Sequence, residues 1–183
     1  MKIIAGKYKG RPFKMPKGIR PTQDVHRKAL FDILKDVIVG ARFLDLFAGS
    51  GAVGLEAYSR AAAQVILVEN NPQCLKVIRE NLKGLGIGER SVKVLAADSL
   101  SAIHFLHRQG QVFDIIFLDP PYLTNALAKK TLQTLSRCDI LSPVGFLICQ
   151  HSKQEVLPEG EGNLTRFRQK KDGDTVFSFF RRL

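Results

Sequence analysis

The sequence is poor in cysteine and contains no long apolar run. Its three cysteines, Cys74, Cys138 and Cys149, are odd in number and widely spaced, and none lies in a Cys-x-x-Cys pair. A disulfide framework and a structural zinc site are therefore not expected, and reduced thiols are typical of the cytoplasm. The apolar runs are much shorter than the roughly 20 residues of a membrane-spanning helix. The opening residues 1–11 also lack the apolar core of a secretory signal. We expect a cytoplasmic protein without a metal or a membrane anchor.

Positive charge is plentiful and unevenly distributed. The net charge is +11, and residues 1–42 contribute 11 Lys/Arg against 3 Asp/Glu, or +8. Residues 43–150 contribute +1 and residues 151–183 contribute +2. A basic surface near the N-terminus would attract a polyanion such as nucleic acid or anionic lipid. Charge alone does not separate such a surface from a basic segment that only keeps the protein soluble.

The first 40 residues indicate a small extension followed by a helix. Two short extended pieces around a glycine turn within residues 2–14 predict a β-hairpin. Thr22 is a suitable N-cap for a helix that would end at Gly40. We expect one domain over residues 1–183, with a basic hairpin extension at 1–20 and a catalytic core at 21–183. The predicted apolar stripe of the helix consists of Val25, Ala29, Leu30, Ile33, Leu34 and Val37.

From residue 42 onward, short apolar runs alternate with helical segments. Helices are predicted near 52–60, 72–84, 99–108 and 124–137, and strands lie between them. This alternation predicts an α/β fold, with a mostly parallel, doubly wound sheet and helices on both faces. Residues 163–170 and 175–183 flank an Asp-Gly turn and predict a C-terminal antiparallel hairpin.

A glycine-rich loop, DLFAGSGAVG at residues 45–54, follows the first strand of this pattern. Gly49, Gly51 and Gly54 match the Gly-x-Gly-x-x-Gly spacing, and Glu69 follows Gly49 by 20 residues. A turn of this kind lets the backbone approach a ligand closely, and Glu69 could accept hydrogen bonds from ribose hydroxyls. By spacing alone the pattern fits a dinucleotide cofactor such as NAD.

Asp45 changes that interpretation. A carboxylate next to a pyrophosphate would be repelled, whereas it suits the amino group of S-adenosylmethionine (SAM). Asp98 lies at the end of the third strand and could accept from the adenine amine, with the Ser99 N–H facing a ring nitrogen. Asp98 and Glu69 could also be a helix cap and a loop acid. The residues expected to bind SAM are Asp45, Phe47, Gly49, Ser50, Gly51, Glu69, Asn70, Asp98 and Ser99.

The stretch DPPY at 119–122 ends the fourth strand. An exocyclic base amine is a weak nucleophile because its lone pair is delocalised. The Asp119 carboxylate and the Pro120 carbonyl could accept from its N–H groups and localise that pair, most effectively in a dry site. Pro121 stiffens the turn, and Tyr122 could stack on an extruded base. We therefore expect Asp119, Pro120, Pro121 and Tyr122 to form the catalytic site of a nucleobase methyltransferase.

Taken together, the motifs resemble the bacterial RsmD-type methyltransferases. The resemblance covers IIAGKYKGR, RPTQDVHRKALFDIL, the glycine loop, VENN, AADS and FLDPPY. It implies a SAM-dependent Rossmann-like fold and methylation of a guanine N2 amine in small-subunit (16S) rRNA. Its partners would be that rRNA, free or within an assembling subunit, and its product S-adenosylhomocysteine. No obligate protein partner is expected. Candidate phosphate contacts are Arg11, Arg20 and Arg27.

Two segments depart from the family pattern, at 25–28 (VHRK) and at 149–152 (CQHS). The pocket residues alone do not separate guanine N2 from adenine N6, since DPPY serves either amine. A non-catalytic rRNA-binding assembly factor with this fold is a further alternative. An NAD-dependent oxidoreductase leaves DPPY unexplained. The sequence identifies neither the modified nucleotide nor the oligomeric state.

Overall fold

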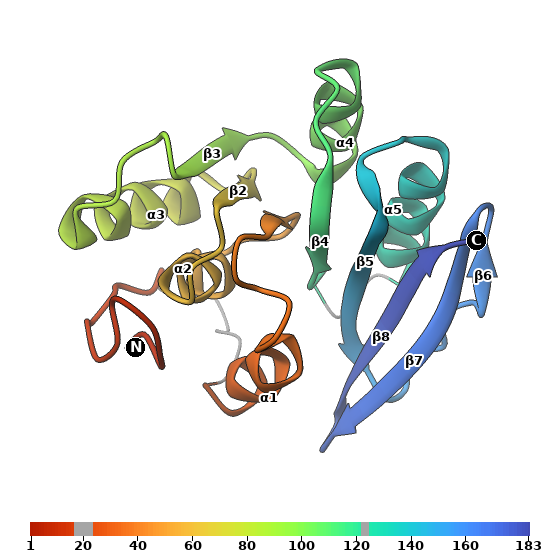
Figure 1. Cartoon of the computed structure of the whole chain (residues 1–183), viewed down its shortest axis with the longest axis horizontal. Coiled ribbons are helices and arrows are strands. Elements are labelled where there is room, and N and C mark those ends of the chain that lie inside the picture. The colour runs from red at the N-terminus through yellow and green to blue at the C-terminus, as the bar shows by residue number, and fades with distance from the viewer. Residues whose placement is uncertain (17–23, 122–124) are drawn as a thin grey trace.

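The computed structural model describes residues 1–16, 24–121 and 125–183 (Figure 1). Helices and strands alternate from the first helix to the fifth strand, and the chain ends in β-structure, as Figure 1 shows. The elements in chain order are α1 (Asp24–Leu34), β1 (Arg42–Asp45), α2 (Ala52–Ser59), β2 (Gln64–Glu69), α3 (Pro72–Leu85), β3 (Val92–Ala96), α4 (Ser99–Arg108), β4 (Phe113–Leu118), α5 (Asn125–Arg137), β5 (Leu141–Ser152), β6 (Gly160–Glu161), β7 (Leu164–Asp172) and β8 (Thr175–Arg182).

These strands form one sheet in the order β3-β2-β1-β4-β5-β8-β7-β6. β1 to β5 pair in parallel, whereas β8, β7 and β6 are added antiparallel. The Asp-Gly turn joins β7 to β8 with Gly173 at φ 62°. The predicted α/β fold with a C-terminal antiparallel hairpin is therefore confirmed. The short strand β6 was not predicted.

Helices cover both faces of the sheet, as a doubly wound fold requires. On one face, apolar residues of α1, α2 and α3 pack with Phe43, Val65 and Ile115 of the strands. On the other face, residues of α4 and α5 pack with Leu44 and Ile116. Because successive strand residues point to opposite faces, the continuous apolar strands supply both cores at once.

Helix α1 is shorter than predicted, and its buried face is different. It ends at Leu34, whose carbonyl accepts from the N–H groups of Val37 and Ile38 in a closing turn. Val25 is 65% exposed and Val37 48% exposed, so these two residues of the predicted stripe do not belong to the buried face. The buried positions are Arg27, Leu30, Phe31 and Leu34. The predicted N-cap Thr22 lies outside the described residues.

The N-terminal extension forms a minimal hairpin that is fastened to the core. Its two arms share one antiparallel bridge, Lys2 to Pro12, rather than two regular strands. Glu56 of α2 explains why the segment is ordered, because its carboxylate accepts from the backbone N–H groups of Ile4 at 2.8 Å and Ala5 at 3.0 Å. The glycine at position 6 allows contact with α2, since a Cβ there would lie 1.8 Å from the Ser59 carbonyl oxygen.

Among the helices that the structure describes, none is both long enough and apolar enough to cross a lipid bilayer.

Candidate functional site

The candidate site lies where the strand order reverses, between β1 and β4. In open α/β sheets ligands bind at this point, beyond the carboxyl ends of the strands. Asp45, the last residue of β1, lies opposite Phe117 of β4, so Asp119 follows two residues beyond that pair. Glu69 ends β2 opposite Ala96 of β3. The register therefore brings the acids predicted at successive strand ends to one edge of the sheet.

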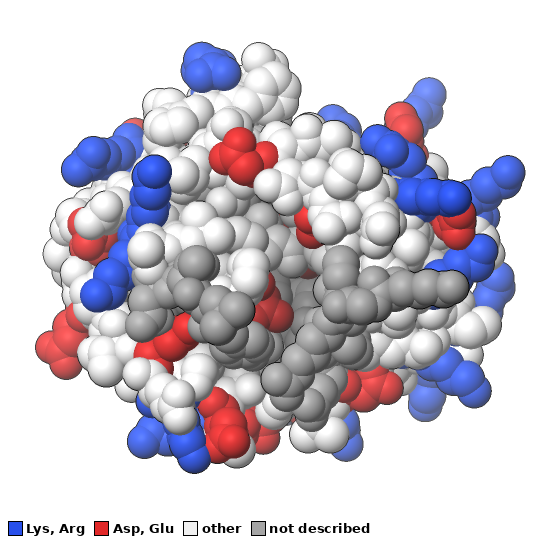
Figure 2. All heavy atoms as spheres, turned by 180° about the vertical axis from the view of Figure 1, so that it is seen from behind, with Lys and Arg blue, Asp and Glu red and all other residues white. Residues whose placement is uncertain are grey.

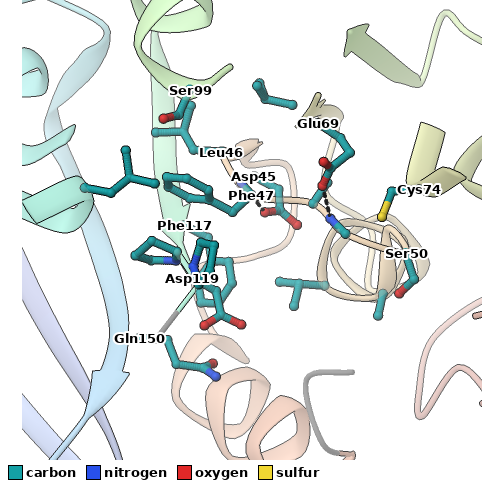
Figure 3. A pocket seen from close by; sticks show the side chains of 18 of the residues that line it. Asp45, Leu46, Phe47, Ser50, Glu69, Cys74, Ser99, Phe117, Asp119 and Gln150 are labelled. Atoms are coloured by element: carbon teal, nitrogen blue, oxygen red, sulfur yellow. Dashed lines mark hydrogen bonds between the residues drawn. The ribbon is translucent and has the colours of Figure 1, made fainter. Parts of the chain in front are cut away.

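A cavity of about 1570 Å³ opens at this edge. Ligand pockets commonly measure about 300–1000 Å³, so this one has room for a cofactor and a second ligand. It contains most of the predicted site residues, and Figure 3 shows several of them pointing into it. Those that line it are Asp45, Phe47, Gly49, Ser50, Glu69, Asn70, Asp98, Ser99, Asp119, Pro120 and Pro121.

The glycine loop is held in place by Glu69. One oxygen of this carboxylate accepts from the Gly49 N–H at 2.8 Å, and the other accepts from the N–H groups of Asn70 and Asn71. Gly49 has φ 55°, and a Cβ added to it would meet no atom within 4 Å. The ribose-acceptor role of Glu69 stays a prediction, and the structure shows that its carboxylate holds the loop.

The other two glycines of the motif serve packing. Gly51 lies outside the cavity lining and has φ 81°. Its Cβ position faces the side chains of Ile78 and Leu67 at 3.4 Å. At Gly54 a Cβ would lie 2.2 Å from the Leu67 Cδ2, so only glycine lets α2 approach β2 this closely. Both glycines bring the start of α2 down on the sheet beneath the loop.

Asp45 is a strongly perturbed acid of the cavity. It is 1% exposed, and its Oδ1 accepts from the Phe47 N–H at 3.3 Å. Burial, with smaller contributions from the nearby Asp119 and Glu69, raises the pKa of this carboxyl to about 8, although the bond from Phe47 opposes the shift. A cationic ligand group would relieve both the desolvation and the repulsion between like charges.

Asp98 is a helix cap that also lines the cavity. Its Oδ1 accepts from the N–H groups of Leu100 and Ser101 at the start of α4. Bonds to Ser101 hold the pKa of Asp98 below its ordinary value, so the carboxyl stays ionised. The helix-cap alternative considered from sequence is therefore present, and it places the acid at the cavity wall beside Ser99.

The end of β4 presents Asp119, Pro120 and Pro121 to the cavity. Gln150 of the neighbouring strand β5 lies beside Asp119 and points toward it in Figure 3. The register explains this, since Leu118 pairs with Cys149. Tyr122, the predicted stacking residue, lies outside the described residues.

Several cavity residues were not predicted as site residues. Gln150 had a usable signal, because β5 is the next strand whose end reaches the same edge. His26 of α1 and the pair Asp174 and Thr175 at the β7–β8 turn also line the cavity. His26 connects these parts, with Nδ1 2.8 Å from the Asp172 Oδ2 and Nε2 3.3 Å from the Thr175 Oγ1. Asp172 and Thr175 are 146 and 149 positions away from His26 in the sequence, so no local pattern predicts the contact.

The predicted RNA-binding arginines have different outcomes. Arg27 is 0% exposed, donates to the Lys2 carbonyl at 2.6 Å and lies 3.7 Å from Glu56. The prediction that it contacts phosphate is wrong, because this guanidinium is buried as part of the attachment of the N-terminal segment. Arg11 is exposed and donates to the Gly84 carbonyl. Arg20 lies outside the described residues.

Charge is distributed very differently in the cavity and over the rest of the molecule. The described lining includes six acids, and His26 is its one side chain that can become positive. Figure 2 shows acidic side chains in the hollow of this face and Lys and Arg around its outline. The whole chain carries a net charge of +11, whereas the cavity is acidic, which fits a cationic ligand inside and a polyanion outside. Within the described ranges, no group of His, Cys, Asp and Glu has the arrangement of a metal site.

Comparisons with known proteins identify a matching family and similar proteins over the whole chain. A family model described as "Conserved hypothetical protein 95" matches residues 1–181. "Ribosomal RNA small subunit methyltransferase D" of Escherichia coli K12 is 34% identical over 100% of this chain and 90% of its own. "Putative rRNA methyltransferase YlbH" of Bacillus subtilis is 33% identical over 100% and 99%. A solved structure, "Putative methyltransferase yhhF from Escherichia coli", is 34% identical, covers 100% and 97%, and has a TM-score of 0.86.

Proposed function

The chain belongs to the family described as Conserved hypothetical protein 95, as its resemblance to RsmD-type methyltransferases predicted, and from this premise we propose its function. It is a SAM-dependent methyltransferase that modifies the N2 amine of a guanine in small-subunit rRNA, in the cytoplasm. The observation that supports this most directly is the single cavity in which Asp45, the glycine loop and Asp119 meet. Relatives that match the whole chain carry the name of an rRNA methyltransferase.

The residues around the glycine loop have the chemistry that SAM requires. Asp45 would face the amino group, where a buried acid of raised pKa gains most from a cation. Glu69 would accept from the ribose while its bonds to the loop persist, and Asp98 with Ser99 would hold the adenine. Phe47, Ser50 and Asn70 complete the wall. The bound cofactor supplies an activated methyl group, so no metal is required.

The β4 end would prepare the base. The Asp119 carboxylate and the Pro120 carbonyl accept from the two N–H bonds of the amine, which localises its lone pair toward the methyl donor. The Asp119 carboxylate would also stabilise the positive charge that develops on the nitrogen as the N–C bond forms, and this charge disappears when the methylated amine releases one N–H proton to solvent. Pro120 and Pro121 hold both acceptors rigidly, because proline fixes the backbone angle φ. Tyr122 is proposed to stack on the base that has left its helix.

The rest of the chain would act as part of the same catalytic unit. Asn81 of α3 accepts from the Lys14 N–H at 2.7 Å and donates to the Ser50 carbonyl at 3.3 Å. Through this side chain the basic N-terminal segment is connected directly to the glycine loop. We therefore treat residues 1–183 as one domain, in which Arg11 and Arg20 face the rRNA backbone.

Transfer of a radiolabelled methyl group from SAM to small-subunit rRNA, free or in subunits, tests the proposal. Asp119→Ala should lower the rate about 100-fold or more, in line with the loss of one preorganised polar group. SAM binding measured by calorimetry should survive, because Asp119 faces the base. The matched control is Asp32→Ala, which removes an exposed acid of α1.

The products of that reaction separate the alternatives. Digestion to nucleosides and mass spectrometry should give N2-methylguanosine. N6-methyladenosine would replace guanine by adenine as the target. Tight, salt-sensitive rRNA binding by a protein that binds no SAM would instead indicate an assembly factor without catalysis.

A further inference from the structure

Three phenylalanine rings form a cluster on the antiparallel part of the sheet, away from the cavity. Phe146 of β5, Phe167 of β7 and Phe179 of β8 have ring centroids 6.2–6.3 Å apart in every pair. Two guanidinium groups lie over these rings. Arg181 is 5.4 Å from the Phe167 centroid, and Arg168 is 5.6 Å from that of Phe179. We call these five residues the Phe167 platform.

An irregularity in β7 creates this arrangement. The register with β8 shifts between Arg166 and Arg168, where Arg166 pairs with Phe180 and Arg168 pairs with Phe179. Two residues of a bulged strand face one residue of its partner, and both Phe167 and Arg168 contact the Phe179 ring. In a regular strand successive side chains point to opposite faces. The bulge therefore presents an aromatic ring and a cation together on one face.

The platform is accessible and positively charged. Phe167 is 44% exposed, although the transfer of a phenylalanine ring out of water is favourable. Residues 164–183 contain six Lys/Arg and two Asp. Among the described residues, neither Arg168 nor Arg181 has an acidic partner within ion-pair distance, whereas Arg166 and Arg182 pair with Glu159 and Asp139. The charge at the platform is thus available to a ligand.

The position of the platform suits a long substrate. Phe146 and Gln150 are four residues apart on β5, so both point to the same face of the sheet. Gln150 lines the cavity, and four strand residues span about 13 Å. In Figure 1 the hairpin of β7 and β8 continues the sheet beyond β5. A chain that places one nucleotide in the cavity could therefore also reach this hairpin.

We propose that the Phe167 platform binds an unpaired nucleotide of the substrate RNA. The base stacks on Phe167 or on the guanidinium plane above it, and Arg168 and Arg181 contact the adjoining phosphates. Exposed rings flanked by arginines are the usual means by which proteins hold single-stranded RNA. An acidic protein segment would match the charge but would leave the exposed ring unused. This inference depends on the proposed function, because it assigns a second contact to the same RNA.

Filter binding of labelled small-subunit rRNA at several salt concentrations tests the platform. Phe167→Leu keeps an apolar side chain in the cluster but removes stacking, and should weaken binding about fivefold or more. Arg181→Gln should make the negative slope of log affinity against log salt shallower by about 0.7, the value for one phosphate contact of a single strand. The matched control is Phe105→Leu on α4, where the phenylalanine is 43% exposed. It should bind like the unchanged protein, and circular dichroism melts should show that all variants fold.

The possible results separate this inference from the proposed function. If Phe167→Leu and Arg181→Gln bind rRNA as the unchanged protein does, the platform is wrong while methyl transfer can still proceed. If both lose affinity but the unchanged protein itself transfers no methyl group, the platform stands and the proposed activity fails. If Phe167→Leu spares rRNA binding but lowers binding of labelled poly-glutamate, the occupant is an acidic protein and the RNA proposal is overturned.

Discussion

Replacing Asp45 with asparagine should make the ligand-free protein more resistant to unfolding at alkaline pH. Asp45 is buried, and its pKa in the folded state is raised from 3.8 to about 8. Between these two values the folded protein holds a proton that the unfolded chain has released. Stability conferred by the neutral carboxyl is therefore lost as pH rises from about 4 to about 8. Asparagine has the same shape, can still accept from Phe47, and does not ionise.

The size of the effect follows from the proton difference. One proton changes the free energy of unfolding by about 1.4 kcal/mol per pH unit. Because the folded carboxyl has released half of that proton at pH 8, the unchanged protein should lose about 2.3 kcal/mol relative to Asp45→Asn between pH 6 and pH 8. For a chain of this length each kcal/mol moves the melting temperature by about 2–4 °C. The difference between the two melting temperatures should therefore widen by about 5–9 °C.

Thermal melts followed by circular dichroism without SAM, at pH 6, 7 and 8, measure this difference. Asp32→Asn is the matched control, because Asp32 is exposed and its substitution should give the same difference at every pH. A melting temperature of Asp45→Asn that tracks the unchanged protein across this range, or falls further below it as pH rises, would refute the assignment of a buried, protonated acid at the cavity.

Two further predictions concern the cofactor and the N-terminal attachment. SAM affinity, measured by calorimetry, should rise by up to about tenfold per pH unit between pH 6 and pH 8 as Asp45 becomes charged. Asp45→Asn should abolish this dependence of affinity on pH. An equal pH dependence in both proteins would exclude Asp45 as the counter-ion of the SAM amino group. Glu56→Gln should reduce the free energy of unfolding in urea by about 3 kcal/mol, because it removes the buried carboxylate that faces buried Arg27 and leaves only the exposed Asp24 to pair with it. A loss no larger than that of the exposed control Glu89→Gln would show that the carboxylate charge of Glu56 is dispensable.

Much of the site could be predicted because its signals are local. Alternating apolar runs and helical segments determine a parallel sheet, and a parallel sheet brings every strand end to one edge. Asp45, Glu69, Asp98 and Asp119 could therefore be placed together by counting along each strand. The glycine loop could also be predicted from the sequence, because a turn that approaches a ligand closely requires glycine at fixed spacing. Local patterns also located the C-terminal hairpin through its Asp-Gly turn.

The sequence by itself thus determined which polar residues stand at the end of each parallel strand. The tertiary structure decided which distant segments contact one another and which side chains they bury. Arg27 looked like a surface charge on a helix, yet packing against Glu56 and the Lys2 carbonyl buries it. His26 reaches the β7–β8 turn and Phe167 joins rings from two other strands, through contacts that no spacing encodes. The physical reason is that strand and helix periods are properties of neighbouring residues, whereas burial and charge pairing depend on which surfaces the folded chain brings together.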